Sequence, residues 1–210
     1  MQKLILASGS PRRRVLMQHM GLRFDVVPST FEEYLDDYRS PAEICVELGV
    51  GKVREVANRY PDAYVVGGDL IIVVDRKQLA KPAEAKQMLE LISGRSHQAY
   101  GSLVLMNKSK DILETNYAVV QITFEPLPAK VIADYIATGD PYDKAGGYAR
   151  RHPLLEPYVT IKGEANALTG LSTLQLRKML TKYGFSIPVN EEDAAKILAN
   201  SDLADMKILI

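Results

Sequence analysis

The sequence contains a single cysteine, Cys45, among its 210 residues. One cysteine cannot form a disulfide within the chain, so a fold held together by disulfides is excluded and a reducing compartment is favoured. Ile44 and Val46 flank this cysteine, which predicts a buried thiol rather than a nucleophile.

Long apolar runs are also missing. No segment approaches the ~20 consecutive apolar residues that a membrane-spanning helix requires. The N-terminus leads directly into an apolar segment, without the charged and then hydrophobic leader that is typical of a secretory signal. We therefore expect a cytoplasmic protein without a membrane partner.

The chain lacks an excess of charge of either sign, because 26 Lys and Arg balance 26 Asp and Glu. This balance argues against nucleic acid or a membrane surface as a partner, so any anion site must be local. Hydrophobic residues make up 47% of the chain, which is typical of a globular protein. A chain of this length can bury one core, or build two small lobes that share one.

Capped helices alternate with apolar strands along the chain. Serine followed by proline predicts helix starts at 10–11 and 40–41, and Glu43 completes a capping box at the second. Two long β-rich segments, 96–107 and 112–124, predict a hairpin. Further strands are expected over 4–7, 23–28, 63–69, 70–75 and 158–162. Helices are expected over 11–20, 41–58, 82–93, 128–138, 172–183 and 191–199, and Gly21, Gly94, Gly139 and Gly184 should end four of them. Strands and helices are mixed throughout, which predicts an α/β or α+β fold.

The most informative stretch is Ser8-Gly9-Ser10-Pro11-Arg12-Arg13, which follows the apolar residues 4–7. Backbone N–H groups at a helix N-terminus, two hydroxyls and the guanidinium groups all favour an anion. Arginine also offers a planar fork that suits phosphate oxygens. A strand-to-helix turn whose arginines face water would give the same pattern, so this motif alone does not decide.

A second informative feature is Asp69, which ends a predicted strand after two glycines. Ligands collect at strand ends in open α/β sheets, and a carboxylate there could hold Mg²⁺ or orient a water for attack on phosphorus. An aspartate that only caps neighbouring backbone N–H groups is the alternative interpretation.

Charged residues elsewhere could complete such a site. Glu32 and Glu33 could supply a second oxygen ligand, although a solvated acidic loop would have the same composition. Lys52 and Lys81 are point charges that suit a triphosphate, but surface lysines are common.

Two other kinds of site are not supported by the sequence. Residues 49–52 resemble part of a phosphate-binding P-loop, but Val46 and Val53 occupy the places of the first glycine and of the Ser/Thr, and the segment falls inside a predicted helix. The three histidines, His19, His97 and His152, are scattered, which argues against a zinc site.

The segment Ser8-Gly9-Ser10-Pro11-Arg12-Arg13 resembles the signature of the Maf family of nucleotide pyrophosphatases, once described as septum-formation inhibitors. Other segments match this family in order and spacing, over about residues 3–185. These are Glu32-Glu33, Leu48-Gly49-Val50-Gly51-Lys52 (Leu-Ala-x-x-Lys in the family), Val66-Gly67-Gly68-Asp69, Leu79-Ala80-Lys81-Pro82, Ser93-Gly94-Arg95-Ser96-His97 and Asp143-Lys144-Ala145-Gly146-Gly147-Tyr148.

The resemblance implies a two-lobed α/β fold, a mixed sheet flanked by helices with a central cleft, similar to that of inosine triphosphatases. It implies hydrolysis of a nucleoside triphosphate to the monophosphate and pyrophosphate with Mg²⁺ or Mn²⁺, and a homodimer as one expected state. Residues 1–187 would form this domain. Residues 188–210 would be a C-terminal extension that packs on the domain or on a partner subunit.

The same resemblance assigns roles to individual residues. Asp69 would be the general base, Glu33 and Asp69 the metal ligands, and Lys81 a third catalytic residue. The expected substrate-binding residues are Ser8, Ser10, Arg12, Arg13 and Lys52. Arg95 and His97 are expected to be structural or to support the residues that touch the substrate.

Base preference is less clearly indicated. The branch of the family with Pro11-Arg12-Arg13 prefers thymidine and uridine triphosphates, and it has Thr and Gln where this chain has Leu70 and Arg151. Leu70 has no hydrogen-bonding group and Arg151 can only donate, so we expect a weakened pyrimidine preference that could admit modified bases. Arg12 should still favour a base edge that carries a carbonyl.

A non-catalytic nucleotide-binding regulator of cell division is the alternative function. The intact set of Glu33, Asp69 and Lys81 favours the enzyme, because a binding module would not need a base beside a metal.

Overall fold

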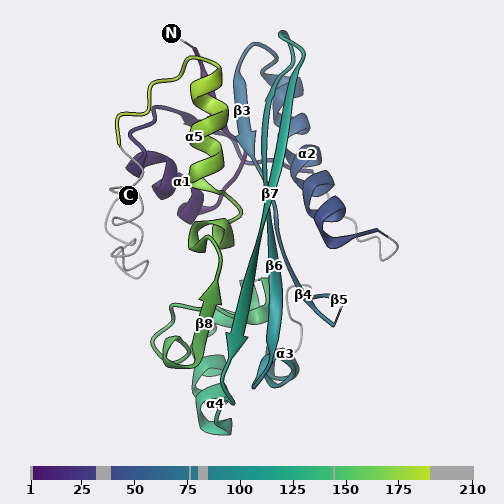
Figure 1. Cartoon of the computed structure of the whole chain (residues 1–210), viewed down its shortest axis with the longest axis vertical. Helices are drawn as coiled ribbons and strands as arrows, with labels where there is room; N and C mark the ends of the chain where they lie inside the picture. The colour runs from purple at the N-terminus through teal and green to yellow at the C-terminus, as the bar shows by residue number, and fades with distance from the viewer. Residues whose placement is uncertain (1, 32–38, 76, 80–84, 144, 190–210) are drawn as a thin grey trace.

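The computed structural model describes residues 2–31, 39–75, 77–79, 85–143 and 145–189 (Figure 1). Within these residues, eight strands form one mixed sheet that is flanked by five α-helices. The predicted mixed α/β class is therefore confirmed. None of the helices in these ranges combines the length and the apolar character needed to cross a membrane.

The elements follow one another in the order expected from the sequence. The strands are β1 (Leu4–Leu6), β2 (Asp25–Val26), β3 (Tyr64–Gly67), β4 (Leu70–Val74), β5 (Lys77–Leu79), β6 (Ser96–Asn107), β7 (Ile112–Phe124) and β8 (Val159–Lys162). The helices are α1 (Pro11–His19), α2 (Pro41–Arg59), α3 (Ala85–Ile92), α4 (Ala129–Ala137) and α5 (Thr173–Lys182), with short 3₁₀ turns between residues 140 and 169.

The β6–β7 hairpin runs through the length of the molecule and joins its two ends (Figure 1). At one end, β1 pairs in parallel with β2 and β3, and α1, α2 and α5 lie beside them. At the other end lie α3, α4 and β8. The two ends therefore form two lobes that share one hairpin.

Strands β3 and β4 lie along the same edge of β6, and both are antiparallel to it. Gly67 pairs with Val104, and Leu70, three residues further on, pairs with Gly101. The register is therefore continuous across the break between the two strands. Only Gly68 and Asp69 fall in this break, so Asp69 lies where the two lobes meet.

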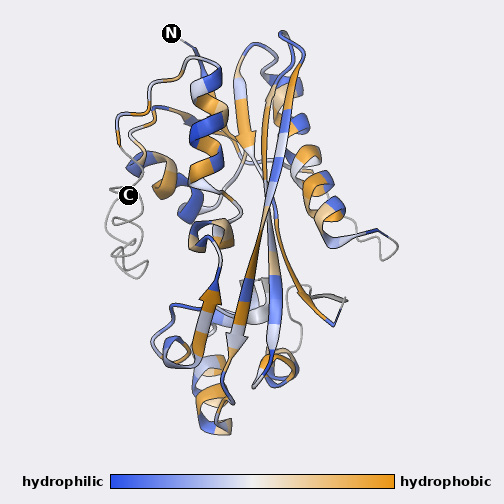
Figure 2. Ribbon diagram, in the orientation of Figure 1, coloured by the Kyte–Doolittle hydropathy of each residue, from blue (hydrophilic) through white to orange (hydrophobic). Residues whose placement is uncertain are grey.

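Helices cover both faces of the sheet at the β1–β3 end. One apolar cluster joins α1 and α5 to the sheet and includes Leu16, Val66 and Leu176. Another joins α2 to the opposite face through Val53 and Val65. Figure 2 shows polar and apolar residues alternating along these helices, as expected for helices that bury one side only.

Most predicted boundaries are confirmed. Ser10 and Ser40 cap α1 and α2, and Ser40 and Glu43 form the predicted capping box. The segment that resembles a P-loop lies inside α2, which agrees with its rejection. Glycines follow α1, α3, α4 and α5 with positive φ, at positions 21, 94, 139 and 184.

Three predictions differ from the structure or lie outside it. The strand predicted over 23–28 pairs over only two residues, and β5 was not predicted. Of the C-terminal extension, the structure describes only Pro188 and Val189, and Pro188 lies directly against Gly21. The helix predicted over 191–199 lies outside the described residues.

A buried aromatic cluster fixes residues 145–152, here called the late loop, on the sheet. His97 on β6 is 4% exposed, and its Nε2 lies 2.5 Å from the hydroxyl of Tyr148. Phe124 stacks on the His97 ring with centroids 5.9 Å apart. Burial lowers the pKa of His97 to about 4, so the imidazole is neutral at physiological pH. This placement agrees with the structural role expected for His97.

We predict that His97→Gln flattens the acid dependence of stability. The lowered pKa means that the unfolded chain binds more protons than the native chain between about pH 4 and 6.5, so stability rises with pH in this window. The difference amounts to roughly 2–4 kcal/mol across the window. Denaturant unfolding of both proteins between pH 4.5 and 7 measures it, and equal slopes would contradict the assignment.

Candidate active site

The Gly68–Asp69 break places a carboxylate against helix α2. Asp69 is 7% exposed, and its Oδ1 lies 2.7 Å from the Nζ of Lys52. Gly67 precedes the break, and a Cβ there would lie 2.7 Å from Val53 on α2. The helix and the strand end therefore pack closely, which brings Lys52 to Asp69.

This pair joins two residues that the sequence analysis assigned to the site separately. A largely buried pair has a fixed geometry, unlike the exposed ion pairs of the surface, which are worth little. The second carboxylate oxygen of Asp69, Oδ2, has no hydrogen bond to the described part of the chain. It is therefore the oxygen that a water or a cation could use.

The turn between β1 and α1 is held by its own hydroxyls. Ser8 Oγ accepts hydrogen bonds from the Ser10 backbone N–H and from Arg13 Nη1, both at 3.2 Å. Ser10 Oγ caps α1 by accepting the Arg13 backbone N–H at 3.5 Å. This turn presents a helix N-terminus, which favours an anion.

The adjacent arginines of this turn have different surroundings. Arg13 is 8% exposed, and its guanidinium donates to the carbonyl of Gly68 at 2.7 Å and to that of Thr169 at 2.8 Å. Arg12 is half-buried and makes no hydrogen bond or ion pair with the residues that the structure describes. Arg12 is thus available to a ligand, whereas Arg13 ties the turn to the backbone beside Asp69.

Cys45 lies behind the site, with its Sγ 3.7 Å from the carbonyl oxygen of Asp69. Its side chain is fully buried and its Sγ lies 3.0 Å from the carbonyl of Tyr100. Burial, together with the negative charge of Asp69, raises the pKa of the thiol to about 12. The predicted burial of the thiol is confirmed, and its raised pKa agrees with the expectation that it is not a nucleophile.

The structure describes only some of the remaining residues that the sequence assigned to the site. Glu33 and Lys81 lie outside the described residues. Leu70 follows Asp69 and packs with the apolar cluster of the α3–α4 lobe. Arg151 is half-buried in the late loop beside Arg150. Burial, and then the charge of Arg151, lowers the pKa of Arg150.

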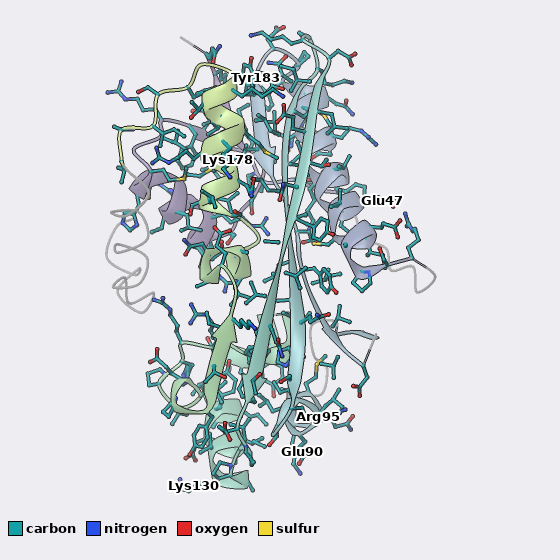
Figure 3. The ribbon with its side chains drawn as sticks, viewed as in Figure 1. Glu47, Glu90, Arg95, Lys130, Lys178 and Tyr183 are labelled. Carbon is teal, nitrogen blue, oxygen red and sulfur yellow. The ribbon has the colours of Figure 1, made fainter. Side chains whose placement is uncertain are left out.

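Arg95 of the Ser-Gly-Arg-x-His segment lies near α3, at the end of the molecule away from α1 and α5 (Figure 3). Its guanidinium pairs with Asp75 at 2.6 Å on the surface. This position agrees with a structural role.

The carboxylate oxygens among the described residues are compatible with binding of a magnesium or manganese ion. Asp69 offers one hard carboxylate oxygen that has no hydrogen bond to the described residues, and Mg²⁺ is commonly bound by one or two carboxylates together with substrate phosphates. Within the described ranges, no three His, Cys, Asp or Glu side chains gather into a metal site. A second carboxylate would have to come from outside these ranges, where Glu33 lies.

Comparison with known proteins identifies the family. The family model described as "Maf-like protein" matches residues 3–183. The chain belongs to this Maf-like family.

Curated relatives of the Maf-like family extend over most of the chain. A protein of Symbiobacterium thermophilum named dTTP/UTP pyrophosphatase is 39% identical over 190 residues, which cover 89% of this chain and 97% of the relative. A protein of Bacillus cytotoxicus with the same name is 39% identical over 186 residues, covering 87% and 96%. A solved structure from Vibrio cholerae matches 66% of this chain and 68% of that one at 15% identity, with a TM-score of 0.31 that bears on neither fold nor function.

One residue that contacts the site was not predicted from the sequence. Ser102 on β6 bonds to the backbone of Asp69, although it lies in no motif and is 33 residues away. The only signal was Gly49, which replaces the alanine of the family's Leu-Ala-x-x-Lys pattern. A Cβ at Gly49 would lie 2.5 Å from the hydroxyl of Ser102.

We predict that Arg13→Ala and Arg12→Ala differ in stability. Arg13→Ala leaves two backbone carbonyls without their charged donor, and each such bond contributes ~1.5–3 kcal/mol, so the free energy of unfolding should fall by about 2–4 kcal/mol. Arg12→Ala should change it by less than about 0.5 kcal/mol. Urea unfolding of both variants measures these changes. Equal losses in the free energy of unfolding would contradict the different roles assigned to Arg12 and Arg13.

Proposed function

We propose that this chain is a nucleoside triphosphate pyrophosphatase that favours dTTP and UTP and produces the nucleoside monophosphate and pyrophosphate. The observation that carries the proposal is the Asp69–Lys52 pair at the break between β3 and β4. A carboxylate and an ammonium held together can serve as base and phosphate ligand. The names of relatives at 39% identity support this choice of reaction.

The triphosphate is bound by cations and by the N-terminus of α1. Arg12 and Lys52 provide charge, and Ser8 and Ser10 provide hydroxyls next to the helix N-terminus. A phosphate that reaches Lys52 Nζ lies beside the Asp69 carboxylate, since the two groups are 2.7 Å apart. Arg13 contributes indirectly by holding the carbonyl of Gly68.

Asp69 acts as the general base. The oxygen of a water forms a bond to the α-phosphorus while the bond from that phosphorus to the bridging oxygen breaks. Pyrophosphate leaves, and the carboxylate takes the proton of the water. Oδ2 of Asp69 has no hydrogen bond within the described ranges, which supports its use as the acceptor of this proton.

The proposal includes Mg²⁺ or Mn²⁺ as a cofactor, with Asp69 and Glu33 as its ligands and Lys81 as a further contact for the phosphates. When bound, such an ion lowers the pKa of a water and neutralises charge on the leaving pyrophosphate. The carboxylate of Asp69 supports this choice of ligand, because only its Oδ1 is hydrogen-bonded within the part of the chain that the structure describes.

The base pocket is less selective than a fully polar one. Leu70 directly follows Asp69 and packs with apolar neighbours, so it cannot reject a mispaired base through an unsatisfied hydrogen bond. Arg12 favours a base edge that carries a carbonyl, and Arg151 in the late loop can only donate. The expected order is therefore uridine and thymidine ahead of adenosine, with a moderate margin and some tolerance of modified bases.

Asp69→Asn tests the reaction directly. The amide keeps the shape of the side chain but loses the negative charge, so kcat for pyrophosphate release from dTTP or UTP should fall by ~10²–10⁴-fold. Nucleotide binding, measured by calorimetry with Mg²⁺, should remain.

Asp75→Asn is the matched control, because Asp75 directly follows β4 on the surface, and it should hydrolyse at the wild-type rate. An Asp69→Asn protein that turns over normally would contradict the mechanism. A wild-type protein that binds triphosphates without releasing pyrophosphate would favour the non-catalytic regulator instead.

Leu70→Thr tests the base preference. A hydroxyl next to Asp69 should raise the kcat/KM ratio of dTTP or UTP over CTP and ATP by about tenfold. The measurement is kcat/KM for UTP, dTTP, CTP, GTP, ATP and 7-methyl-GTP at one metal concentration. A wild-type protein that strongly prefers a purine triphosphate would contradict this expectation. It would show that Leu70 and Arg151 give the pocket a different base preference instead of a weaker pyrimidine preference.

A further inference from the structure

Ser102 holds both backbone polar groups of Asp69. Its backbone N–H donates to the Asp69 carbonyl at 2.9 Å, and its Oγ accepts the Asp69 backbone N–H at 2.8 Å. In a regular antiparallel pair the second bond would go to the carbonyl of the opposite residue. Here the side chain of Ser102 takes the place of that carbonyl, at the one point where β3 and β4 are interrupted.

The Ser102 hydroxyl makes a third bond, to the helix that carries Lys52. Ser102 Oγ donates to the carbonyl of Cys45 on α2 at 2.8 Å. A hydroxyl has one proton to donate, so the roles are fixed: it donates to Cys45 and accepts from Asp69. Ser102 is completely buried. One side chain therefore connects the segment of Asp69 to the helix of Lys52.

Gly49 leaves the space that the Ser102 hydroxyl occupies. Gly49 lies on α2 between Cys45 and Lys52, one helical turn from each, so the three residues share a face. A Cβ at Gly49 would lie 2.5 Å from Ser102 Oγ, closer than real contacts allow, and 3.2 Å from Gly68 Cα and from the Val104 side chain. Since glycine weakens the interior of a helix by roughly 0.5–1 kcal/mol relative to alanine, its presence here has a packing reason.

We propose that Ser102 is a positioning residue, which sets the Asp69 carboxylate against Lys52 by bonding the backbone of Asp69 and the carbonyl of Cys45, and that Gly49 admits its hydroxyl. This inference rests on the proposed hydrolysis. It adds a residue that contacts neither substrate nor reacting atoms. Small displacements of a reacting group can cost up to ~10²-fold in rate, so the hydroxyl should matter for kcat.

Ser102→Ala is the first test. We expect kcat for dTTP or UTP to fall ~10–100-fold while KM changes less than about twofold, because the residues that bind the phosphates stay in place. Ser93→Ala is the matched control, since its Oγ also accepts a backbone N–H, that of Leu127, at 2.8 Å. Ser93→Ala should lower the melting temperature without changing kcat.

Gly49→Ala approaches the same hydroxyl from the helix. The added methyl should displace the Ser102 hydroxyl, so this variant should reproduce the kcat loss of Ser102→Ala. In the Ser102→Ala background the 2.5 Å contact is gone and only the 3.2 Å contacts with Gly68 and Val104 remain, so Gly49→Ala should lower kcat by a smaller factor than it does alone. Losses in kcat that multiply in the double variant would contradict the pairing of these two residues.

A readout without turnover separates this inference from the proposed reaction. The side-chain ¹⁵N resonance of Lys52 reports its ion pair with Asp69, and it should shift in Ser102→Ala and Gly49→Ala but not in Ser93→Ala. An unchanged resonance, or a Ser102→Ala protein with wild-type kcat well below its melting temperature, would overturn the positioning role. If wild-type protein hydrolyses no triphosphate, the proposed function fails, and the Lys52 resonance still decides the role of Ser102.

Discussion

The ion pair between Asp69 and Lys52 is the interaction on which the rest of the site depends. Removing two charges from water is costly, and a largely buried pair is weak support for stability. A chain that keeps such a pair at a strand break, where sheet hydrogen bonding is interrupted, gives up stability for chemistry. The surrounding structure then has to hold the break in one conformation.

Arg13 and Ser102 hold that break from two different elements. Arg13 reaches from α1 to the carbonyl of Gly68, and Ser102 on β6 bonds both polar groups of the Asp69 backbone. Gly68 itself must be glycine, because a Cβ there would lie 1.9 Å from the Ser102 carbonyl oxygen. These contacts hold the backbone of Gly68 and Asp69 in one conformation. The direction of the Asp69 carboxylate is therefore set by backbone contacts as well as by its own side-chain contact with Lys52.

Sequence patterns predicted what depends on local chemistry. Serine caps, closing glycines and the long hairpin were correctly placed, and Asp69 was expected at a strand end. The different surroundings of Arg12 and Arg13 were not predictable, because both lie in the first turn of α1 and only tertiary contacts decide which one turns inward. Ser102 was missed for a similar reason. It meets Asp69 only because β4 pairs with β6 in a particular register, and no pattern of neighbouring residues in the sequence indicates that pairing.

The most direct test of the account is a crystal structure with α,β-imido-dUTP, which cannot release pyrophosphate, in the presence of Mg²⁺. The account predicts the α-phosphorus beside Asp69, with a water ~3–3.5 Å from it and Lys52 on a phosphate oxygen. Elsewhere, a cavity of about 970 Å³ lies between α2 and β7 and is lined by residues that include Arg39, Arg54 and Tyr117. A triphosphate bound there, with Asp69 and Lys52 still paired to each other and free of the ligand, would contradict the central claim.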